Sequence, residues 1–173
     1  GLGIAYYNLG KYSEATESLT AAAQLDGASF AARYNLGLAA AAAGDLPGAE
    51  KAYREALALQ PDHARCLNNL GWVLQQTNRP ADAVDPLQKA VAADPTLAMA
   101  QINLALAYER SGNAEAARKQ WLQATTSFPD NAHAHFGLAN SYYSTEEKDG
   151  ALQEYLRALA LENSNAEAHN NAG

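Results

Sequence analysis

Apolar positions along this chain follow a helical spacing. In the central stretch Leu67, Leu70 and Leu74 mark one run, and Ala83 and Leu87 mark a second run after a polar break. Residues three, four or seven positions apart lie on one face of an α-helix, so each run predicts an amphipathic helix. The short polar break between the runs predicts a tight turn. Together they predict an antiparallel helix pair.

The same pair recurs along almost the whole chain. A small residue follows an apolar one every 34 residues, at Gly3, Gly37, Gly71, Ala105 and Ala139. An alanine follows each of these at a fixed distance, at Ala15, Ala49, Ala83, Ala117 and Ala151. One helix pair cannot bury both of its faces, so such copies must stack. The period therefore predicts an all-α solenoid of antiparallel helix pairs.

The pattern sets the expected helices and copies. We predict helices at 1–9, 12–25, 30–43, 46–59, 64–76, 80–93, 98–111, 114–127, 132–144, 148–161 and 165–173. We read residues 1–173 as one array, with a truncated copy at 1–29, full copies at 30–63, 64–97, 98–131 and 132–165, and the start of another at 166–173. Because the first residue is Gly1 and enters mid-helix, we expect this to be an excerpt of a longer array.

Start and stop signals agree with these helices. We expect a side-chain oxygen to cap a first helix at Asp62, Thr96, Asp130 and Ser164. Turns inside a pair carry residues that tolerate a positive φ, namely Gly10, Gly44, Asn78 and Gly112.

Two sites depart from the repeat pattern. Pro86 lies inside a predicted helix and should bend it modestly, since proline lacks one backbone donor. The turn at 145–150 lacks the glycine and should be looser.

Close approach of the paired helices needs small residues in contact, and we expect Gly71 to face Ala83.

Composition excludes several classes of function. The chain has 12 basic against 19 acidic residues and a net charge of -7, which argues against nucleic acid and an anionic membrane surface. No apolar run is long enough to predict membrane insertion. Cys66 is the only cysteine, so we expect no internal disulfide and an inert, partly buried thiol. The compartment is not readable from the sequence; we favour the cytoplasm.

The repeat resembles a known family. Leu70, Gly71, Leu74, Ala83, Leu87, Ala90 and Pro95 match the pattern of the tetratricopeptide repeat. The leading tryptophan of that pattern is absent, and its tyrosine is replaced by Ala40 and Leu74 in two copies. Ala40 should leave the second copy less tightly packed. The resemblance implies a right-handed superhelix whose first helices line a concave groove that binds a peptide or a partner protein.

Helical spacing assigns residues to that groove. The candidate peptide-binding residues are Tyr34, Asn35, Leu38, Arg65, Asn68, Asn69, Trp72, Ile102, Asn103, Leu106, Phe136 and Asn140. The aromatic members would contact apolar side chains of a ligand.

Three of these residues form a row. Asn35, Asn69 and Asn103 stand at successive 34-residue steps, while Gly1 and Gly137 interrupt the series. An amide both donates and accepts, so a row of them can hold the backbone of an extended peptide. The row resembles the asparagine ladder of the repeat domain of O-linked N-acetylglucosamine transferases. The alternative is that these amides bond to backbone within their own solenoid.

No chemistry-bearing constellation accompanies the repeat. The four histidines are joined by no cysteine or carboxylate set, so we predict no metal site, no cofactor and no catalytic residues. We therefore expect a non-enzymatic module that binds a peptide or a partner protein. One alternative is the substrate-recognition arm of a larger enzyme such as a glycosyltransferase. Another is a scaffold that self-associates head to tail, 166–173 of one chain against 1–9 of the next.

Overall fold

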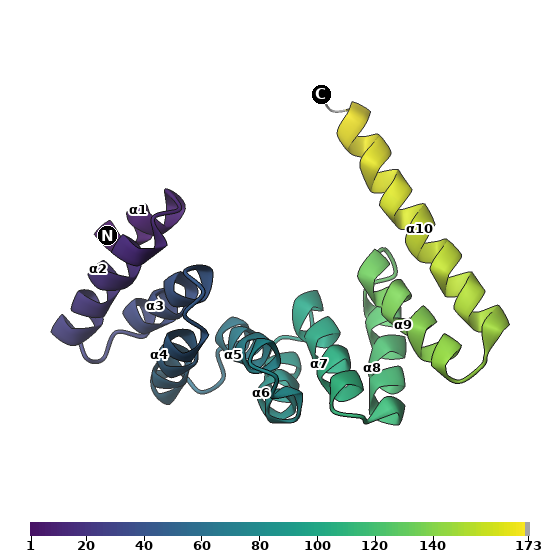
Figure 1. Ribbon diagram of the computed structural model, residues 1–173, viewed down its shortest axis with the longest axis horizontal. Helices are drawn as coiled ribbons and strands as arrows, with labels where there is room; N and C mark the ends of the chain where they lie inside the picture. Colours follow the sequence, from purple (N-terminus) through teal and green to yellow (C-terminus); the bar gives the residue numbers. More distant parts are fainter. Residues whose placement is uncertain (172–173) are drawn as a thin grey trace. The chain divides into compact units, whose positions relative to one another are not determined.

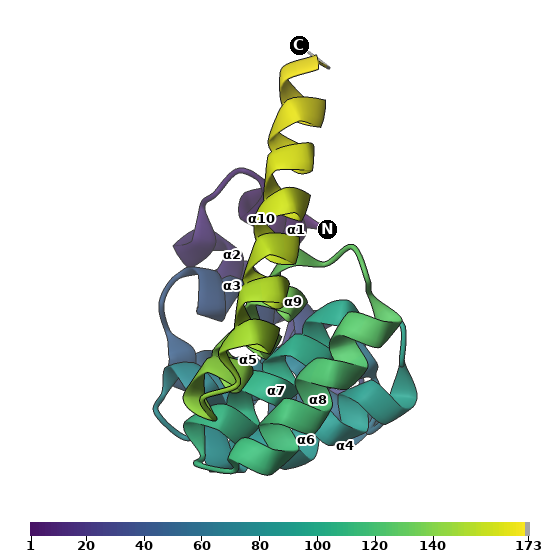
Figure 2. The same cartoon turned by 90° about the vertical axis from the view of Figure 1, so that its right-hand side faces the viewer.

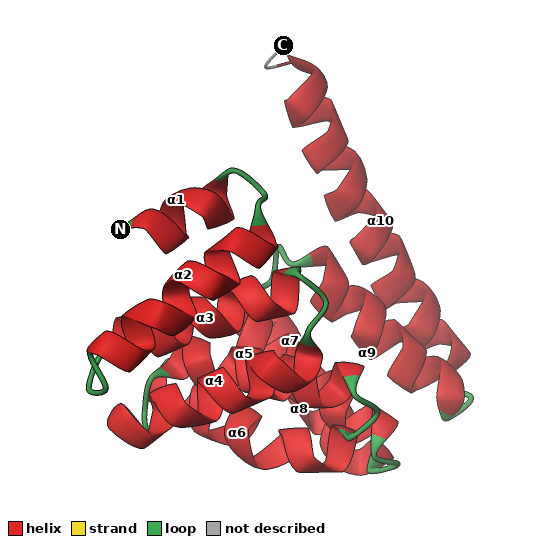
Figure 3. Ribbon diagram, turned by 60° about the vertical axis from the view of Figure 1, so that its left-hand side comes forward, coloured by secondary structure: helices red, strands yellow, loops and turns green. Residues whose placement is uncertain are grey.

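The computed structural model describes the backbone of residues 1–171 and the side chains of residues 1–162. Within that part of the chain all regular structure is helical, and short loops join successive helices (Figure 3). The helices are α1 (Leu2–Asn8), α2 (Tyr12–Leu25), α3 (Phe30–Ala42), α4 (Leu46–Leu59), α5 (Ala64–Gln76), α6 (Pro80–Ala93), α7 (Ala98–Arg110), α8 (Ala114–Ser127), α9 (Ala132–Ser144) and α10 (Lys148–Asn171). The first nine follow the predicted helices to within one residue.

The chain divides into two compact units, Gly1–Leu97 and Ala98–Gly173. In the first unit successive helices from α1 to α6 pack against one another, and in the second unit successive helices from α7 to α10 do the same (Figure 1). Each unit is therefore a stack of helical hairpins, as the period predicts. The division falls between two of the predicted copies.

The small residues of the repeat lie where the helices meet. The alanines Ala15, Ala49, Ala83, Ala117 and Ala151 are all buried. A Cβ on Gly71 would lie 2.7 Å from Cδ2 of Leu87, and Leu87 is the side chain nearest to it. The closest approach at Gly71 is therefore to the Leu87 side chain, and the expected contact with Ala83 stays a prediction.

Turn geometry follows the prediction. Gly10, Gly44 and Gly112 have φ between 73° and 83°, and Asn78 has φ 59°. The fifth turn keeps the same geometry, because Glu146 takes the left-handed conformation with φ 64°. That conformation is unfavourable for a residue with a Cβ. Pro86 lies inside α6, which continues through it.

Two of the predicted caps are wrong by one residue. The cap of α5 is His63, whose Nδ1 accepts from the Cys66 N–H, and not Asp62. The cap of α9 is Asn131 and not Asp130. Both helices begin where predicted, at Ala64 and Ala132, and the residue directly before each helix, not the one before that, reaches the free amides. Thr96 donates its hydroxyl to Asp94 instead.

The end of the chain also differs from the prediction. We expected a break near 162–164, with Ser164 as a cap, but α10 runs without interruption from Lys148 to Asn171. Figure 2 shows α10 continuing well past the end of α9. Three earlier copies end at Pro61, Pro95 and Pro129, whereas Asn163 stands at this place. Asparagine keeps its backbone N–H, so nothing in the sequence forces the helix to stop.

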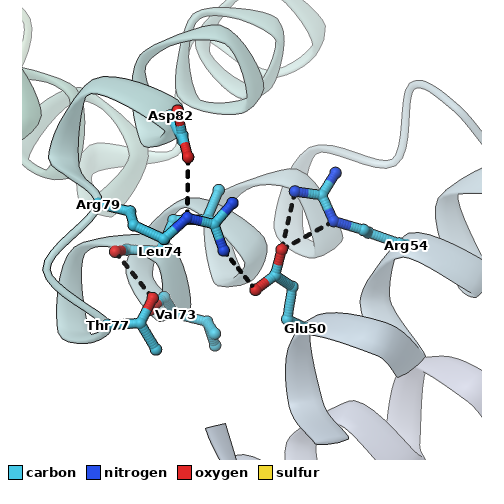
Figure 4. Close-up of polar contacts among 7 residues, drawn as sticks. All are labelled: Glu50, Arg54, Val73, Leu74, Thr77, Arg79 and Asp82. Atoms are coloured by element: carbon cyan, nitrogen blue, oxygen red, sulfur yellow. Dashed lines mark hydrogen bonds and ion pairs between the residues drawn. The ribbon is translucent and has the colours of Figure 1, made fainter. Parts of the chain in front are cut away.

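Ion pairs link successive hairpins inside each unit. Glu50 of α4 accepts from Arg54 and from Arg79 in the α5–α6 turn, and Arg79 also contacts Asp82 at 2.8 Å (Figure 4). In the second unit Arg118 of α8 donates to Glu147 in the α9–α10 turn at 2.8 Å. Arg79 and Glu147 occupy the same place in the repeat, as do Glu50 and Arg118. The second pair therefore repeats the first with its charges reversed.

Candidate functional site

A pocket opens on the face that the first helix of each hairpin presents in the first unit. It has a volume of about 250 Å³. Its lining residues are Tyr7, Leu38, Ala41, Ala42, Tyr53, Asn69 and Trp72. We call it the first-helix pocket. It brings together three of the predicted peptide-binding residues, Leu38, Asn69 and Trp72.

The repeat explains why this pocket forms. Leu38 and Trp72 are one 34-residue period apart, so α3 and α5 present them at the same height of the stack. Ala41 also lines the pocket, and its small side chain takes up little of the space. Trp72 is 38% exposed, so its indole forms an accessible wall. A concave apolar site with a few polar groups is the usual form of a recognition pocket.

The polar group of the pocket is the amide of Asn69. Its Nδ2 donates to the Tyr34 hydroxyl at 3.4 Å, and its Oδ1 accepts from Asn68 at 3.3 Å. Both bonds are long for their kind and therefore weak. A ligand backbone could replace either bond at small cost. Burial raises the pKa of the Tyr34 hydroxyl above its ordinary value.

The Tyr34 ring packs in an aromatic cluster with Phe30 and His63. Tyr34 stacks on Phe30 with ring centroids 5.6 Å apart, and the His63 ring lies 4.5 Å from Phe30. The Nδ1 of His63 accepts a backbone N–H, so its proton sits on Nε2 in the neutral ring. The hydrogen bond that caps α5 therefore also orients the His63 ring against Phe30 and Tyr34. Sequence reasoning missed Phe30 and His63, although Phe30 stands one helical turn before Tyr34.

The other predicted residues of the first unit lie outside the pocket. Asn35 donates Nδ2 to the carbonyl of Ala31 at 2.7 Å, within its own helix. This bond is of the kind that the alternative interpretation of the asparagine row expects. Arg65 is exposed, and Asn68 is 8% exposed and buried beside Asn69.

In the second unit several predicted residues take part in packing. Ile102 is 7% exposed and lies in a core cluster with Trp121 and Leu138, and Leu106 packs against that cluster. Asn103 is 5% exposed. Little of these side chains remains for a ligand.

Two predicted residues of the second unit contact α10. Phe136 is 54% exposed and meets the edge of Tyr155 at 5.6 Å. Asn140 accepts the Tyr155 hydroxyl at 2.6 Å.

The interruption of the asparagine row at Gly137 has a structural cause. A Cβ at Gly137 would lie 2.6 Å from three atoms of the Trp121 indole. The large ring of Trp121 therefore occupies the space that a side chain would need.

The structure gives no sign of metal or thiol chemistry in its described part. No group of three metal-ligating side chains is present among the described residues. Burial raises the pKa of Cys66 to about 12, and its thiol contacts the Tyr53 carbonyl at 3.7 Å. His135 is held between Glu154 and the carbonyl of Pro129. Over residues 1–171, every helix is too short or too polar to cross a bilayer.

Models of the tetratricopeptide repeat match residues 1–29, 28–96 and 102–169. No curated protein sequence matches the chain at a significant level.

Many solved structures are similar in fold. A crystal structure of MamA has TM-score 0.91 at 20% identity, covering 96% of this chain and 98% of that one. MamA from Desulfovibrio magneticus RS-1 has TM-score 0.88 at 24% identity, covering 94% and 92%. YrrB, described as a TPR protein with an unusual peptide-binding site, has TM-score 0.80 at 21% identity, covering 92% and 82%.

Proposed function

Because the chain belongs to the tetratricopeptide-repeat family, we propose that it is a protein-interaction module whose first-helix pocket receives a segment of a partner protein. The observation that carries this proposal is the first-helix pocket itself. It combines an exposed indole, an aliphatic wall and an amide with weak internal bonds. YrrB, a protein of similar fold, is described as having a peptide-binding site.

The pocket suits one apolar side chain of an extended peptide. Its volume of about 250 Å³ lies below the range of sites that enclose a whole drug-sized ligand. Trp72 and Leu38 would contact the apolar side chain, and Asn69 would pair with the neighbouring peptide group. Each such hydrogen bond contributes about 0.5–1.5 kcal/mol net. The indole contact is therefore expected to dominate the affinity.

The test uses binding partners selected from a display library of short peptides on the full chain. Trp72→Ala should weaken the selected peptides at least about tenfold, which corresponds to ~1.4 kcal/mol. The paired change Asn69→Ala and Asn103→Ala tests the asparagine row in the same titration. Leu156→Ala, an exposed leucine of α10, is the matched control. Unchanged affinity in Trp72→Ala would exclude the first-helix pocket as the binding site.

A second candidate function is head-to-tail self-association. An apolar pocket of about 540 Å³ lies between α1, α2 and α3, and Leu2 and Leu25 at its edge are 64% and 90% exposed. The complementary segment that the sequence suggested, 166–173, lies outside the residues whose side chains are described. Light scattering at high concentration is the test. A monomer, or an oligomer unaffected by Leu2→Glu, would remove this candidate.

A further inference from the structure

A larger pocket lies between α2, α3 and α4 and shares no residue with the first-helix pocket. It has a volume of about 530 Å³. Its lining includes Thr16, Arg33, Leu36, Ala40, Gly48 and Ala52. We call it the Ala40 pocket. Its volume is within the usual range of ligand sites.

The pocket contains the place of a missing aromatic ring. Ala40 stands where other copies carry Tyr6, Tyr108 and Tyr142. The Tyr142 ring lies 4.7 Å from the guanidinium carbon of Arg118, and a Cβ on Gly150 would lie 3.4 Å from that ring.

The residues that surround the Tyr142 ring have counterparts in the first unit. Three periods earlier in the sequence, the equivalents of Arg118, Tyr142 and Gly150 are Thr16, Ala40 and Gly48. All three line the Ala40 pocket.

The next copy carries an equivalent pocket with a larger side chain at this position. Leu74 stands at the place of Ala40 and lines an equivalent pocket of about 400 Å³ between α4, α5 and α6. Other residues correspond as well, since Leu36 is matched by Leu70 and Lys51 by Asp85. The larger side chain accompanies the smaller pocket. Of these two equivalent pockets, the one that Ala40 lines has the larger volume.

The walls and rim of the Ala40 pocket differ in polarity. Ala23, Leu36 and Ala52 supply apolar surface. At the rim Arg33 pairs with Glu55 at 3.5 Å. The rim thus offers both donors and acceptors, which suit the peptide groups on either side of an inserted ring.

We propose that the Ala40 pocket binds the phenol ring of a tyrosine side chain on a protein partner, so that the partner supplies the ring that the second copy lacks. The proposal rests on the proposed interaction function in one respect, namely that the tyrosine comes from a protein partner. The shape of the site comes from the missing tyrosine side chain, and the rim selects a peptide over a free phenol. This site would act in addition to the first-helix pocket.

The experiment titrates the full chain with N-acetyl-L-tyrosinamide and follows backbone amide shifts by NMR. We expect saturable shifts of Thr16, Gly48 and Ala52 at millimolar probe. Ala40→Tyr should reduce probe affinity at least about tenfold, because the variant's own ring fills the site. Ala40→Leu should give an intermediate loss, as the Leu74 pocket suggests, and it serves if the tyrosine variant fails to fold.

Controls separate this site from the first-helix pocket. Trp72→Ala should leave the tyrosinamide shifts unchanged, because Trp72 does not line the Ala40 pocket. The titration therefore tests the Ala40 pocket even if the first-helix pocket binds no peptide. N-acetyl-L-leucinamide should bind more weakly than the tyrosine probe. Equal binding of p-cresol and tyrosinamide would overturn the assignment to a peptide tyrosine. Absent shifts, or shifts that persist undiminished in both Ala40 variants, would overturn the proposal as a whole.

Discussion

Gly37 allows α3 to approach α4, and replacing it with alanine should destabilise the first unit. A Cβ at this place would lie 2.6 Å from Cδ1 and 2.9 Å from Cζ of Tyr53, and closer still to Cε1. Tyr53 is 1% exposed and its ring lies 6.2 Å from that of Tyr34. Because the ring is buried against this neighbour, it has little room to turn away from the added methyl group.

The size of the effect follows from two opposing terms. Overpacking of a filled core costs about 1–3 kcal/mol. Replacing glycine by alanine inside a helix returns about 1 kcal/mol through the helix propensity. Gly37→Ala should therefore lose up to about 2 kcal/mol of unfolding free energy, and a chain of this length loses roughly 2–4 °C in Tm per kcal/mol.

The matched control is the same change at Gly150. A Cβ there would meet the Tyr142 ring at 3.4 Å, an ordinary van der Waals contact. Gly150→Ala should therefore be neutral or stabilise by about 0.5 kcal/mol through helix propensity. Urea unfolding followed by circular dichroism measures both variants. If Gly37→Ala proved as stable as Gly150→Ala, close approach would not be the reason for glycine in the repeat.

Three further predictions concern single side chains. Glu146→Gly should raise the urea midpoint, with a gain of about 1 kcal/mol, because glycine adopts a positive φ without strain; a lower midpoint would contradict this. Cys66 should resist a thiol reagent at mildly alkaline pH and react fully in denaturant, because burial raises its pKa to about 12; rapid labelling of the native chain would refute the assignment. Arg118 lowers the pKa of Glu147, so this pair stabilises the fold above the ordinary glutamate pKa and the contribution disappears as pH falls through the lowered value. Arg118→Gln should flatten that acid dependence of the urea midpoint, and an unchanged slope would contradict it.

The helices were predictable because the period fixes them. Paired helices of fixed length, turn glycines and buried alanines all follow from residues that recur every 34 positions. Caps were less predictable, because Asp62 and His63 are both able to accept an amide N–H and the choice depends on a one-residue shift. The continuation of α10 through Ser164 depends on the absence of a proline, which a periodic pattern does not register.

The candidate site was predictable only in part. Helical spacing places a side chain on one side of a helix, but neighbouring helices decide whether it is exposed. Ile102 and Trp72 follow the same reasoning, yet Ile102 is covered by Trp121 and Leu138 while Trp72 remains open. The Ala40 pocket could not be predicted from the sequence, because it depends on both the missing tyrosine side chain and the positions of α2, α3 and α4. The sequence shows only that alanine replaces tyrosine at position 40.

The reversed ion pairs between hairpins bear on how such arrays can be rearranged. A hairpin grafted after α4 must bring a cation to meet Glu50, whereas one grafted after α8 must bring an anion to meet Arg118. Exchanging the α5–α6 and α9–α10 hairpins would set Glu147 beside Glu50 and Arg79 beside Arg118. Like charges at that distance repel, so the exchange should lower the stability of both junctions by a small amount, since these side chains are partly exposed. Duplication or recombination of this gene segment would therefore favour products that keep the present order.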